Sequence, residues 1–192
     1  MAATLGVNHI AFATGRLDET LRFWRDLIGL RLVGRFGAPG YRQYFLDAGA
    51  GALLSFLEWP GVGPVAEKDH GVPIRGPFAF DHVAFTVETE EELWSFKDRL
   101  DAAAIWVSEV IDHGFIRSVY AFDPNNIPIE FACPVPGVDL AGHPRLVDRS
   151  PGEAAGEGPD PQPGHWPRAR PTPAGDRRTY PGSWLEHFPE RR

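Results

Sequence analysis

Residues 8–30, NHIAFATGRLDETLRFWRDLIGL, are repeated in pattern by residues 81–103, DHVAFTVETEEELWSFKDRLDAA. His9 and His82 are 73 positions apart. The same spacing of 73 separates two further pairs, Phe23 from Phe96 and Leu27 from Leu100. Similarity at one fixed spacing indicates a duplicated structural unit. The two copies are therefore predicted to share one fold.

Each copy begins with a strand pattern that leads into a helix pattern. Ile10 and Phe12 alternate with three smaller or polar residues, and this period of two is typical of a strand with one buried face. Val83 and Phe85 alternate in the same way. Apolar residues at helical spacing follow in both copies, with acidic residues near the expected helix start. The face of the first strand opposite the apolar one carries His9, Ala11 and Ala13.

Three short strands are predicted after each helix. They cover residues 30–36, 41–47 and 52–58 in the first copy, and residues 105–110, 116–122 and 127–132 in the second. The unit is therefore β-α-β-β-β, present twice, with repeats at about residues 5–60 and 79–133. The predicted fold class is α+β: two such repeats form a curved mixed-sheet cup with helices on one side.

Composition excludes several classes of protein. The chain has 192 residues and a formal net charge of −7, which argues against a nucleic-acid or anionic-membrane partner because both require a basic face. Its one cysteine cannot form an intrachain disulfide, and no signal peptide or apolar span of membrane length is visible. We expect a cytoplasmic protein that binds a small-molecule substrate.

The composition changes near Pro134. Twelve of the 19 prolines lie between Pro134 and the C-terminus, and proline disfavours regular helices and central strands. We therefore predict a domain over residues 1–133 and a Pro/Gly-rich C-terminal extension over residues 134–192. Aromatic residues in the extension favour an arm that packs on the domain or on a second subunit, and a loose tail is the alternative.

Glu130 interrupts an apolar strand, IPIEFAC, and a buried carboxylate is costly without a partner. By strand alternation it points away from Ile129 and Phe131. His9 and His82 also point away from the large apolar residues of their strands. If the strands curve around one cup, the three side chains converge as a metal site of two imidazoles and one carboxylate, an arrangement suited to Fe(II) and related divalent ions.

The motifs NHIAF, DHVAF and YAFDPNNIPIEF resemble the vicinal oxygen chelate superfamily, which includes glyoxalase I, type I extradiol dioxygenases, fosfomycin-resistance thiol transferases and bleomycin-binding proteins. The resemblance covers about residues 5 to 133. It implies that His9, His82 and Glu130 bind a divalent metal, with Fe(II) favoured and Mn(II), Zn(II) or Ni(II) possible. Asn126 stands where the family usually has glycine, and asparagine tolerates the left-handed turn that this position requires.

The metal-ligand set also distinguishes the members of the superfamily that this sequence resembles. Glyoxalase I-like enzymes place a second carboxylate at the position of Ser55, and Glu58 has the opposite strand parity. Serine is a poor metal ligand. The ligand set therefore resembles the extradiol dioxygenases or the fosfomycin transferases more than glyoxalase I.

An extradiol-type dioxygenase that cleaves a small catechol-like substrate with O₂ is the favoured interpretation. The resemblance implies catalytic roles for three residues: Tyr120, which precedes Glu130 by ten positions, and His70 and His113, the candidates for the acid/base histidine. It leaves open whether His9 joins the other ligands within one chain or from a partner chain, and the aromatic residues of the C-terminal extension favour a homodimer. No separate cofactor-binding residue is assigned.

Two alternatives stay open. The first is another metalloenzyme of the superfamily, a glyoxalase-like lyase or isomerase or a thiol transferase. The second is a non-catalytic protein that binds a drug or another small molecule. The fold alone does not choose between them.

Overall fold

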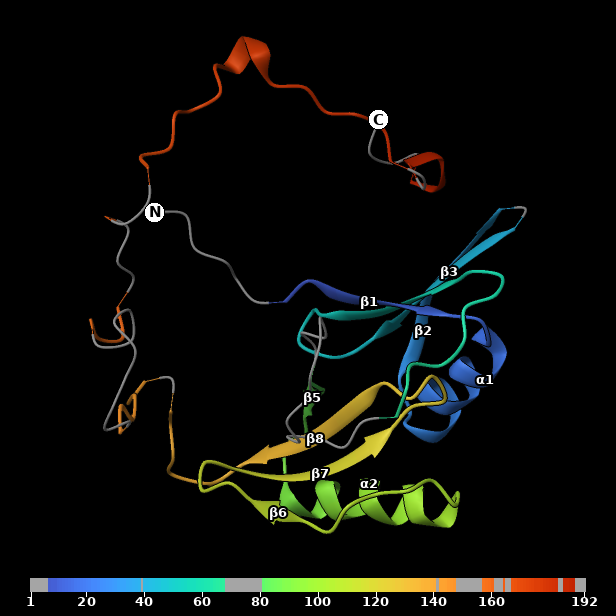
Figure 1. Ribbon diagram of the computed structural model, residues 1–192, viewed down its shortest axis with the longest axis vertical. Helices are drawn as coiled ribbons and strands as arrows, with labels where there is room; N and C mark the ends of the chain where they lie inside the picture. Colours follow the sequence, from blue (N-terminus) through green and yellow to red (C-terminus); the bar gives the residue numbers. More distant parts are fainter. Residues whose placement is uncertain are drawn as a thin grey trace. The chain divides into compact units, whose positions relative to one another are not determined.

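The computed structural model divides into two compact units, Met1–Val138 and Asp139–Arg192. The first contains two four-stranded sheets, each with a helical segment (Figure 1). The structure describes residues 7–38, 40–67, 81–140, 142–147, 157–160, 164, 167–182 and 185–188.

The first module runs β1 (His9–Thr14), α1 (Leu17–Leu21), η1 (Arg22–Leu27), β2 (Arg31–Ala38), β3 (Tyr41–Asp47) and β4 (Leu53–Glu58). Its strand order is β1-β4-β3-β2, with β1 parallel to β4 and the other pairs antiparallel. The α-helix continues into the π-helical turn η1, and Gly29 follows with a φ of +98°. This positive φ, which glycine adopts without steric cost, ends the helix.

The second module runs β5 (Val83–Thr86), α2 (Glu90–Ala102), β6 (Ile111–Asp112), β7 (Ile116–Phe122) and β8 (Pro128–Pro134), in the sheet order β5-β8-β7-β6. Thr89 and Glu92 form a capping box that fixes the start of α2. The turn before β8 contains Asn126 with a φ of 58°, the left-handed conformation expected at this position.

The predicted strand over residues 105–110 is wrong in position. Only Val107 forms an isolated bridge, to Ala121, and the strand itself is the two-residue β6 further along. Ser108 explains the interruption, because the backbone N–H of Tyr120 donates to the Ser108 side-chain oxygen at 2.9 Å. A side chain thus takes a place in the ladder that a backbone carbonyl would take in a continuous strand.

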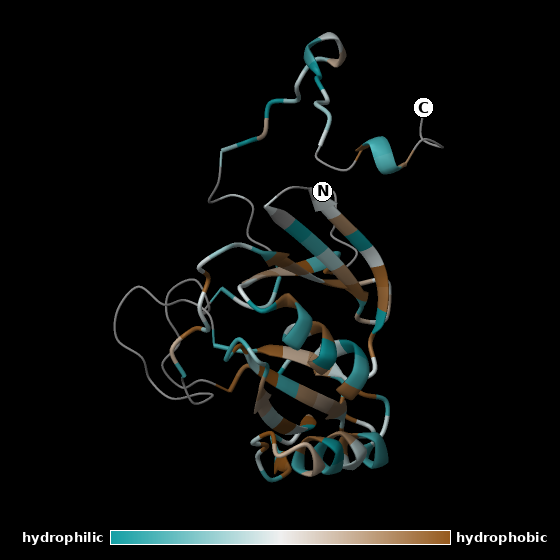
Figure 2. Cartoon of the chain, turned by 90° about the vertical axis from the view of Figure 1, so that its right-hand side faces the viewer, coloured by the Kyte–Doolittle hydropathy of each residue, from teal (hydrophilic) through white to brown (hydrophobic). Residues whose placement is uncertain are grey.

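The duplication is visible in the register of the two sheets. Ala11 pairs with Ser55 between β1 and β4, and Ala84 pairs with Glu130 between β5 and β8. Apolar and hydrophilic residues are mixed along the strands (Figure 2). The predicted α+β fold of two βαβββ units is therefore confirmed, with two mixed four-stranded sheets.

Both helical segments cover the apolar faces of the sheets. Phe96 of α2 stacks on Phe131 of β8 with ring centroids 4.4 Å apart. Trp24 of η1 is fully buried. Its ring centroid lies 6.0 Å from that of Phe56 in β4 and 5.3 Å from that of Phe85 in β5, so Trp24 packs against both modules. Among the described elements, no helix covers the opposite face of either sheet.

A buried polar network also joins the modules. The indole N–H of Trp24 donates to Asp123 Oδ2 at 3.1 Å, and Thr14 donates to the side-chain oxygen of Asn125 at 2.6 Å. Asn125 in turn donates to Thr20. Burial raises the pKa of Asp123, although four N–H groups donate to its carboxylate. These contacts fix the β7–β8 turn, and with it β8, against the first module.

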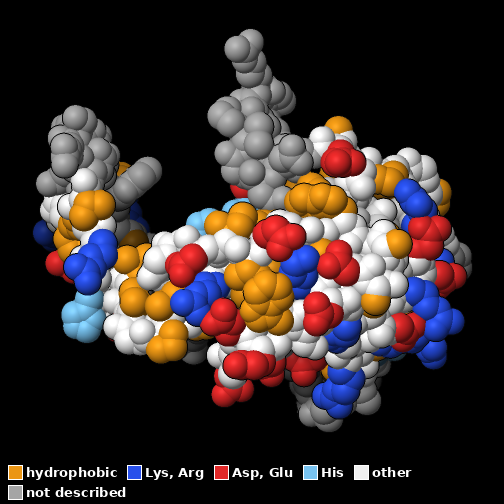
Figure 3. Space-filling view, turned by 90° about the horizontal axis from the view of Figure 1, so that it is seen from below, with side chains coloured by type: hydrophobic (Ala, Val, Ile, Leu, Met, Phe, Trp, Pro, Cys, Tyr) orange, Lys and Arg blue, Asp and Glu red, His pale blue; other side chains and the backbone are white. Residues whose placement is uncertain are grey.

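Seen from below in Figure 3, the first unit shows acidic, basic and apolar side chains interspersed. In the second unit the structure describes two short 3₁₀ turns, η3 (Ala174–Asp176) and η4 (Leu185–His187), and nearly all of the described residues are exposed. None of the described helices is long and apolar enough to cross a membrane.

Candidate metal centre

Glu130 and His82 meet on the helix-free face of the second sheet. Glu130 lies at the middle of β8, and His82 immediately precedes β5, the strand parallel to β8. The Nε2 atom of His82 is 2.8 Å from Oε2 of Glu130. Strand alternation brings both to this face, as the sequence predicts, while Phe131 and Phe85 point to the helices.

The carboxylate of Glu130 is buried and only partly satisfied. Glu130 is 3% exposed, and its Oε1 has no hydrogen-bond partner among the described atoms. A buried carboxylate oxygen without a partner is costly, and a cation at this position would compensate it. Two ligand atoms about 2.1 Å from one ion, at right angles, lie about 3 Å apart, close to the observed His82–Glu130 separation. The pair therefore fits a divalent metal.

Tyr120 and His113 extend this site along β7. Tyr120 is paired with Glu130 in the register of β7 and β8, and its hydroxyl donates to the Glu130 carboxylate. Burial, the nearby Glu130 charge and this hydrogen bond raise the pKa of Tyr120 to about 12, so the phenol keeps its proton at neutral pH. His113 Nε2 lies 2.9 Å from the Tyr120 hydroxyl oxygen, within hydrogen-bond distance, and His113 is exposed. A path of hydrogen bonds thus runs from Glu130 to the surface.

His9 lies on the corresponding face of the first sheet. Its ring is 6.5 Å from that of Phe45, in an edge-on arrangement, and the strand's outward residues Ala11 and Ala13 are exposed. His9 thus occupies an open part of β1, next to an aromatic side chain of β3.

The predicted parity of Ser55 and Glu58 is confirmed. Ser55 takes the register of Glu130 in the first sheet, and its hydroxyl accepts a hydrogen bond from Gln43. Glu58 faces the other way, where Arg42 donates to it at 2.5 Å and the Leu17 N–H at 3.3 Å. The first module therefore places no carboxylate at the position that Glu130 occupies in the second.

The structure brings together some of the predicted residues and not others. His82, Glu130, Tyr120 and His113 form one connected group. His9 is not part of it: no cluster of three or more His, Cys, Asp or Glu side chains able to hold a metal ion occurs among the described residues of this chain. His70 lies outside the described residues.

Two residues that the sequence interpretation did not assign to the site contact the histidines. Asp81 Oδ2 lies 2.6 Å from His82 Nδ1, and Asn8 Oδ1 lies 2.9 Å from His9 Nδ1. The repeat spacing in the sequence points to both residues, because Asn8 and Asp81 are also 73 positions apart and precede the histidines in NHIAF and DHVAF.

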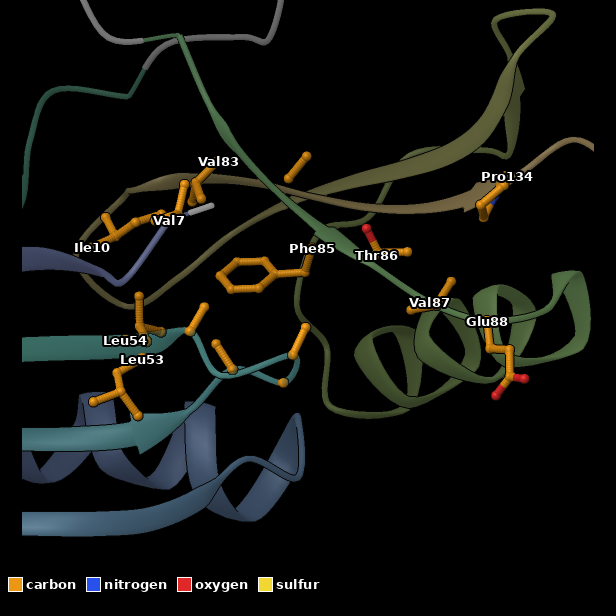
Figure 4. A pocket seen from close by; sticks show the side chains of 15 residues that line it. Val7, Ile10, Leu53, Leu54, Val83, Phe85, Thr86, Val87, Glu88 and Pro134 are labelled. Atoms are coloured by element: carbon orange, nitrogen blue, oxygen red, sulfur yellow. The ribbon is translucent and has the colours of Figure 1, made fainter. Parts of the chain in front are cut away.

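An apolar cavity of about 730 Å³ lies between the two modules (Figure 4). It is lined by the whole of β5, by Ile10 and Leu54 of the first sheet and by the β3–β4 turn. His82, Glu130 and Tyr120 do not line it. The cavity follows the edge of β5, which has no strand partner on that side among the described strands, and is separate from the charged group.

Residues 6–131 match the family described as the Glyoxalase/Bleomycin resistance protein/Dioxygenase superfamily. The chain belongs to this superfamily. The match covers both modules and all strands of the first unit except the end of β8. Family membership accords with the duplicated fold and with a pair of ligand-type side chains on the helix-free face of the second sheet.

Relatives within the superfamily have different activities. The chain is 33% identical over 90 residues to a putative ring-cleaving dioxygenase, MhqO, of Bacillus subtilis, and 24% identical over 131 residues to an iron-dependent extradiol dioxygenase of Rhodococcus jostii. These alignments cover 40% and 67% of this chain, but only 28% and 43% of the relatives. The glutathione transferase FosA of Serratia marcescens is 29% identical over 127 residues, which are 65% of this chain and 77% of FosA.

Solved structures share the fold. A glyoxylase/bleomycin resistance protein/dioxygenase domain from Frankia sp. superposes with a TM-score of 0.59 at 20% identity, covering 71% of this chain and 96% of that domain. A mutant of the fosfomycin resistance protein FosX of Listeria monocytogenes, in complex with Mn(II), gives a TM-score of 0.54 at 19% identity over 73% of this chain and 98% of that chain. At these identities the likeness concerns the fold alone.

Proposed function

We propose that this protein is a metal-dependent enzyme, an extradiol-type dioxygenase that cleaves a small catechol-like substrate with O₂. The observation that carries the proposal is the pairing of His82 Nε2 with Glu130 Oε2 at 2.8 Å, beside a buried Glu130 oxygen without a described partner. The iron-dependent and ring-cleaving relatives support the choice of Fe(II). The chain spans less than half of the length of each of these two relatives.

The third ligand is His9 from a second copy of the chain. Within one chain His9 stays apart from His82 and Glu130, and the face of β1 that carries it is exposed. The strands β1 and β5 are both terminal in their described sheets, so each has a free edge toward another strand. A homodimer in which the first sheet of one chain faces the second sheet of the other would complete two identical sites.

The bound ion would supply Lewis-acid and one-electron chemistry toward a chelated diol and O₂. The chain's own residues do the rest. Tyr120, whose phenol stays protonated, donates a hydrogen bond to Glu130 or to a substrate oxygen placed beside it. His113 exchanges a proton between the Tyr120 hydroxyl and solvent. His70 stays a candidate acid/base residue from the sequence.

A thiol transfer to an epoxide is the second candidate function. It is favoured by the FosA relative, of which the chain covers 77%, far more than of either dioxygenase. The presence of Tyr120 and His113 beside the ligand pair favours ring cleavage instead, because that reaction requires a proton donor and acceptor at the diol oxygens.

The test is metal analysis followed by two assays. Protein purified without oxygen should contain close to one divalent ion per chain and, with Fe(II), should convert catechols to a yellow ring-opened product. If the protein adds glutathione to fosfomycin and does not convert catechols, the proposed activity is that of a thiol transferase and not that of a dioxygenase. Metal-free protein that nevertheless binds small aromatic compounds would support the non-catalytic binding alternative.

A further inference from the structure

The two histidines assigned to the metal are held in the same way. In each case the side chain of the preceding residue contacts Nδ1: Asp81 Oδ2 lies 2.6 Å from His82 Nδ1, and Asn8 Oδ1 lies 2.9 Å from His9 Nδ1. The contact therefore occurs twice, at equivalent positions of the duplicated unit.

This contact determines which nitrogen is available. When an oxygen accepts the Nδ1 proton, the lone pair of a neutral imidazole lies on Nε2, and the ring cannot turn freely. In His82 the freed nitrogen, Nε2, is the one that lies 2.8 Å from Glu130. The Asp81 contact thus fixes the ring in the orientation that directs its ligand nitrogen toward the buried carboxylate.

We propose that Asp81 and Asn8 are positioning residues that fix the tautomer and orientation of His82 and His9 for metal binding. The proposal rests on the proposed metal site. It adds that the hydrogen bond to the histidine differs in strength between the two copies, because Asp81 carries a charge and Asn8 does not. Hydrogen bonds to an ionised acceptor are roughly twice as strong as neutral ones. His82 is therefore the firmly held ligand and His9 the weakly held one.

The first test measures the affinity of the full chain for Zn(II) by competition with a chelator. Asp81→Ala should weaken binding about 10- to 100-fold, the usual effect of removing a group that orients a ligand. Asp81→Asn, which restores the arrangement seen at Asn8, should recover part of the loss. Asn8→Ala should weaken binding less than Asp81→Ala does. Asp98→Ala, which removes an exposed charge from α2, is the control and should leave the affinity unchanged.

Equal losses in Asp81→Ala and Asp81→Asn would overturn the positioning role, because they would assign the effect to charge alone. Wild-type affinity in Asp81→Ala would overturn it as well. If wild-type protein binds no metal, the proposed function fails, and the second test decides the positioning role independently.

The second test needs no metal. In the Glu130→Ala variant His82 Nε2 loses its acceptor while Asp81 remains. At a pH where His82 is neutral, ¹⁵N NMR of the imidazole should then show a proton on Nδ1 and none on Nε2. Adding Asp81→Ala should move the proton to Nε2, and the same tautomer in both variants would contradict the inference.

His143 provides an internal reference signal for this experiment. It is an exposed histidine of the second unit, and its Nδ1 lies 3.7 Å from Asp139 Oδ2. The resonances of His143 should therefore be the same with and without the Asp81→Ala substitution. A shift of both histidines together would indicate a general change in structure and would count against a local role for Asp81.

Discussion

Ser55 occupies in the first sheet the register that Glu130 occupies in the second. Ser55 pairs with Ala11 and Phe45, and Glu130 pairs with Ala84 and Tyr120. The duplicated unit thus carries a metal-type carboxylate in one copy and a hydroxyl in the other. In the proposed site, two imidazoles and this one carboxylate would leave coordination positions open for a substrate and O₂.

Loss of a ligand should remove the metal. His82→Ala and Glu130→Gln should each reduce the bound metal from close to one ion per chain to near zero, as measured by elemental analysis of protein prepared side by side. His143→Ala, which removes an exposed histidine of the second unit, is the matched control and should keep the metal. Retention of metal by His82→Ala would show that the ion binds elsewhere.

Removal of the Tyr120 hydroxyl should affect turnover rather than metal content. Tyr120→Phe deletes the hydroxyl that forms hydrogen bonds with Glu130 and His113. We expect a decrease in kcat of about 10²-fold, in the range of lost general acid–base catalysis, with metal content unchanged. His113→Ala should cost less in the Tyr120→Phe background than in the wild type, because the two residues act through one hydrogen-bond path. Additive effects would argue against that path.

The buried network at the module boundary should respond to pH through Asp123. Burial raises its pKa, so the folded state holds the proton more tightly than the unfolded chain does. The resulting stabilisation is complete below the unfolded pKa, about 3.9, and is lost as the pH rises through the folded pKa. The stability advantage of the wild type over Asp123→Asn should therefore shrink as the pH rises above about 4 toward neutrality. Urea denaturation across this range measures it, and an advantage that grows with pH would contradict the account.

The stabilisation that Glu58 contributes should have the opposite pH dependence. The hydrogen bond from Arg42 lowers the pKa of Glu58. Its stabilisation is therefore present above the unfolded pKa and is lost as the pH falls through the folded pKa. Glu58→Gln should cost about 1 kcal/mol at neutral pH, since the pair is partly exposed, and little in strong acid. The same urea series tests this prediction, and a cost independent of pH would refute the role of the Arg42 contact.

The sequence predicts the strands and helices well where alternation and the charge at the helix start are clear signals. The face of the first strand follows from Ile10 and Phe12, and the acidic residues Glu90, Glu91 and Glu92 lie in the first turn of α2. The strand at residues 105–110 was misplaced because the hydrogen bond of Ser108 to the Tyr120 N–H is a side-chain contact that periodicity does not report.

The candidate site is predictable only in part, for a physical reason. Alternation places Glu130 and His82 on one face, and the parallel pairing of β5 and β8 brings them together within one sheet. Whether His9 meets them depends on how two separate sheets are arranged, and the repeat pattern is the same for a cup formed within one chain or between two. Asp81 and Asn8 were missed because their contact depends on side-chain geometry at the strand start.

Mixing two inactive variants tests the shared site most directly. His9→Ala supplies intact His82 and Glu130, and Glu130→Ala supplies intact His9. If each site takes His9 from one chain and the other ligands from its partner, unfolding and refolding the two variants together should restore one metal ion, and activity, per mixed dimer. Mixtures that stay as metal-free as either variant alone, while the wild type treated in the same way regains its metal, would contradict the account.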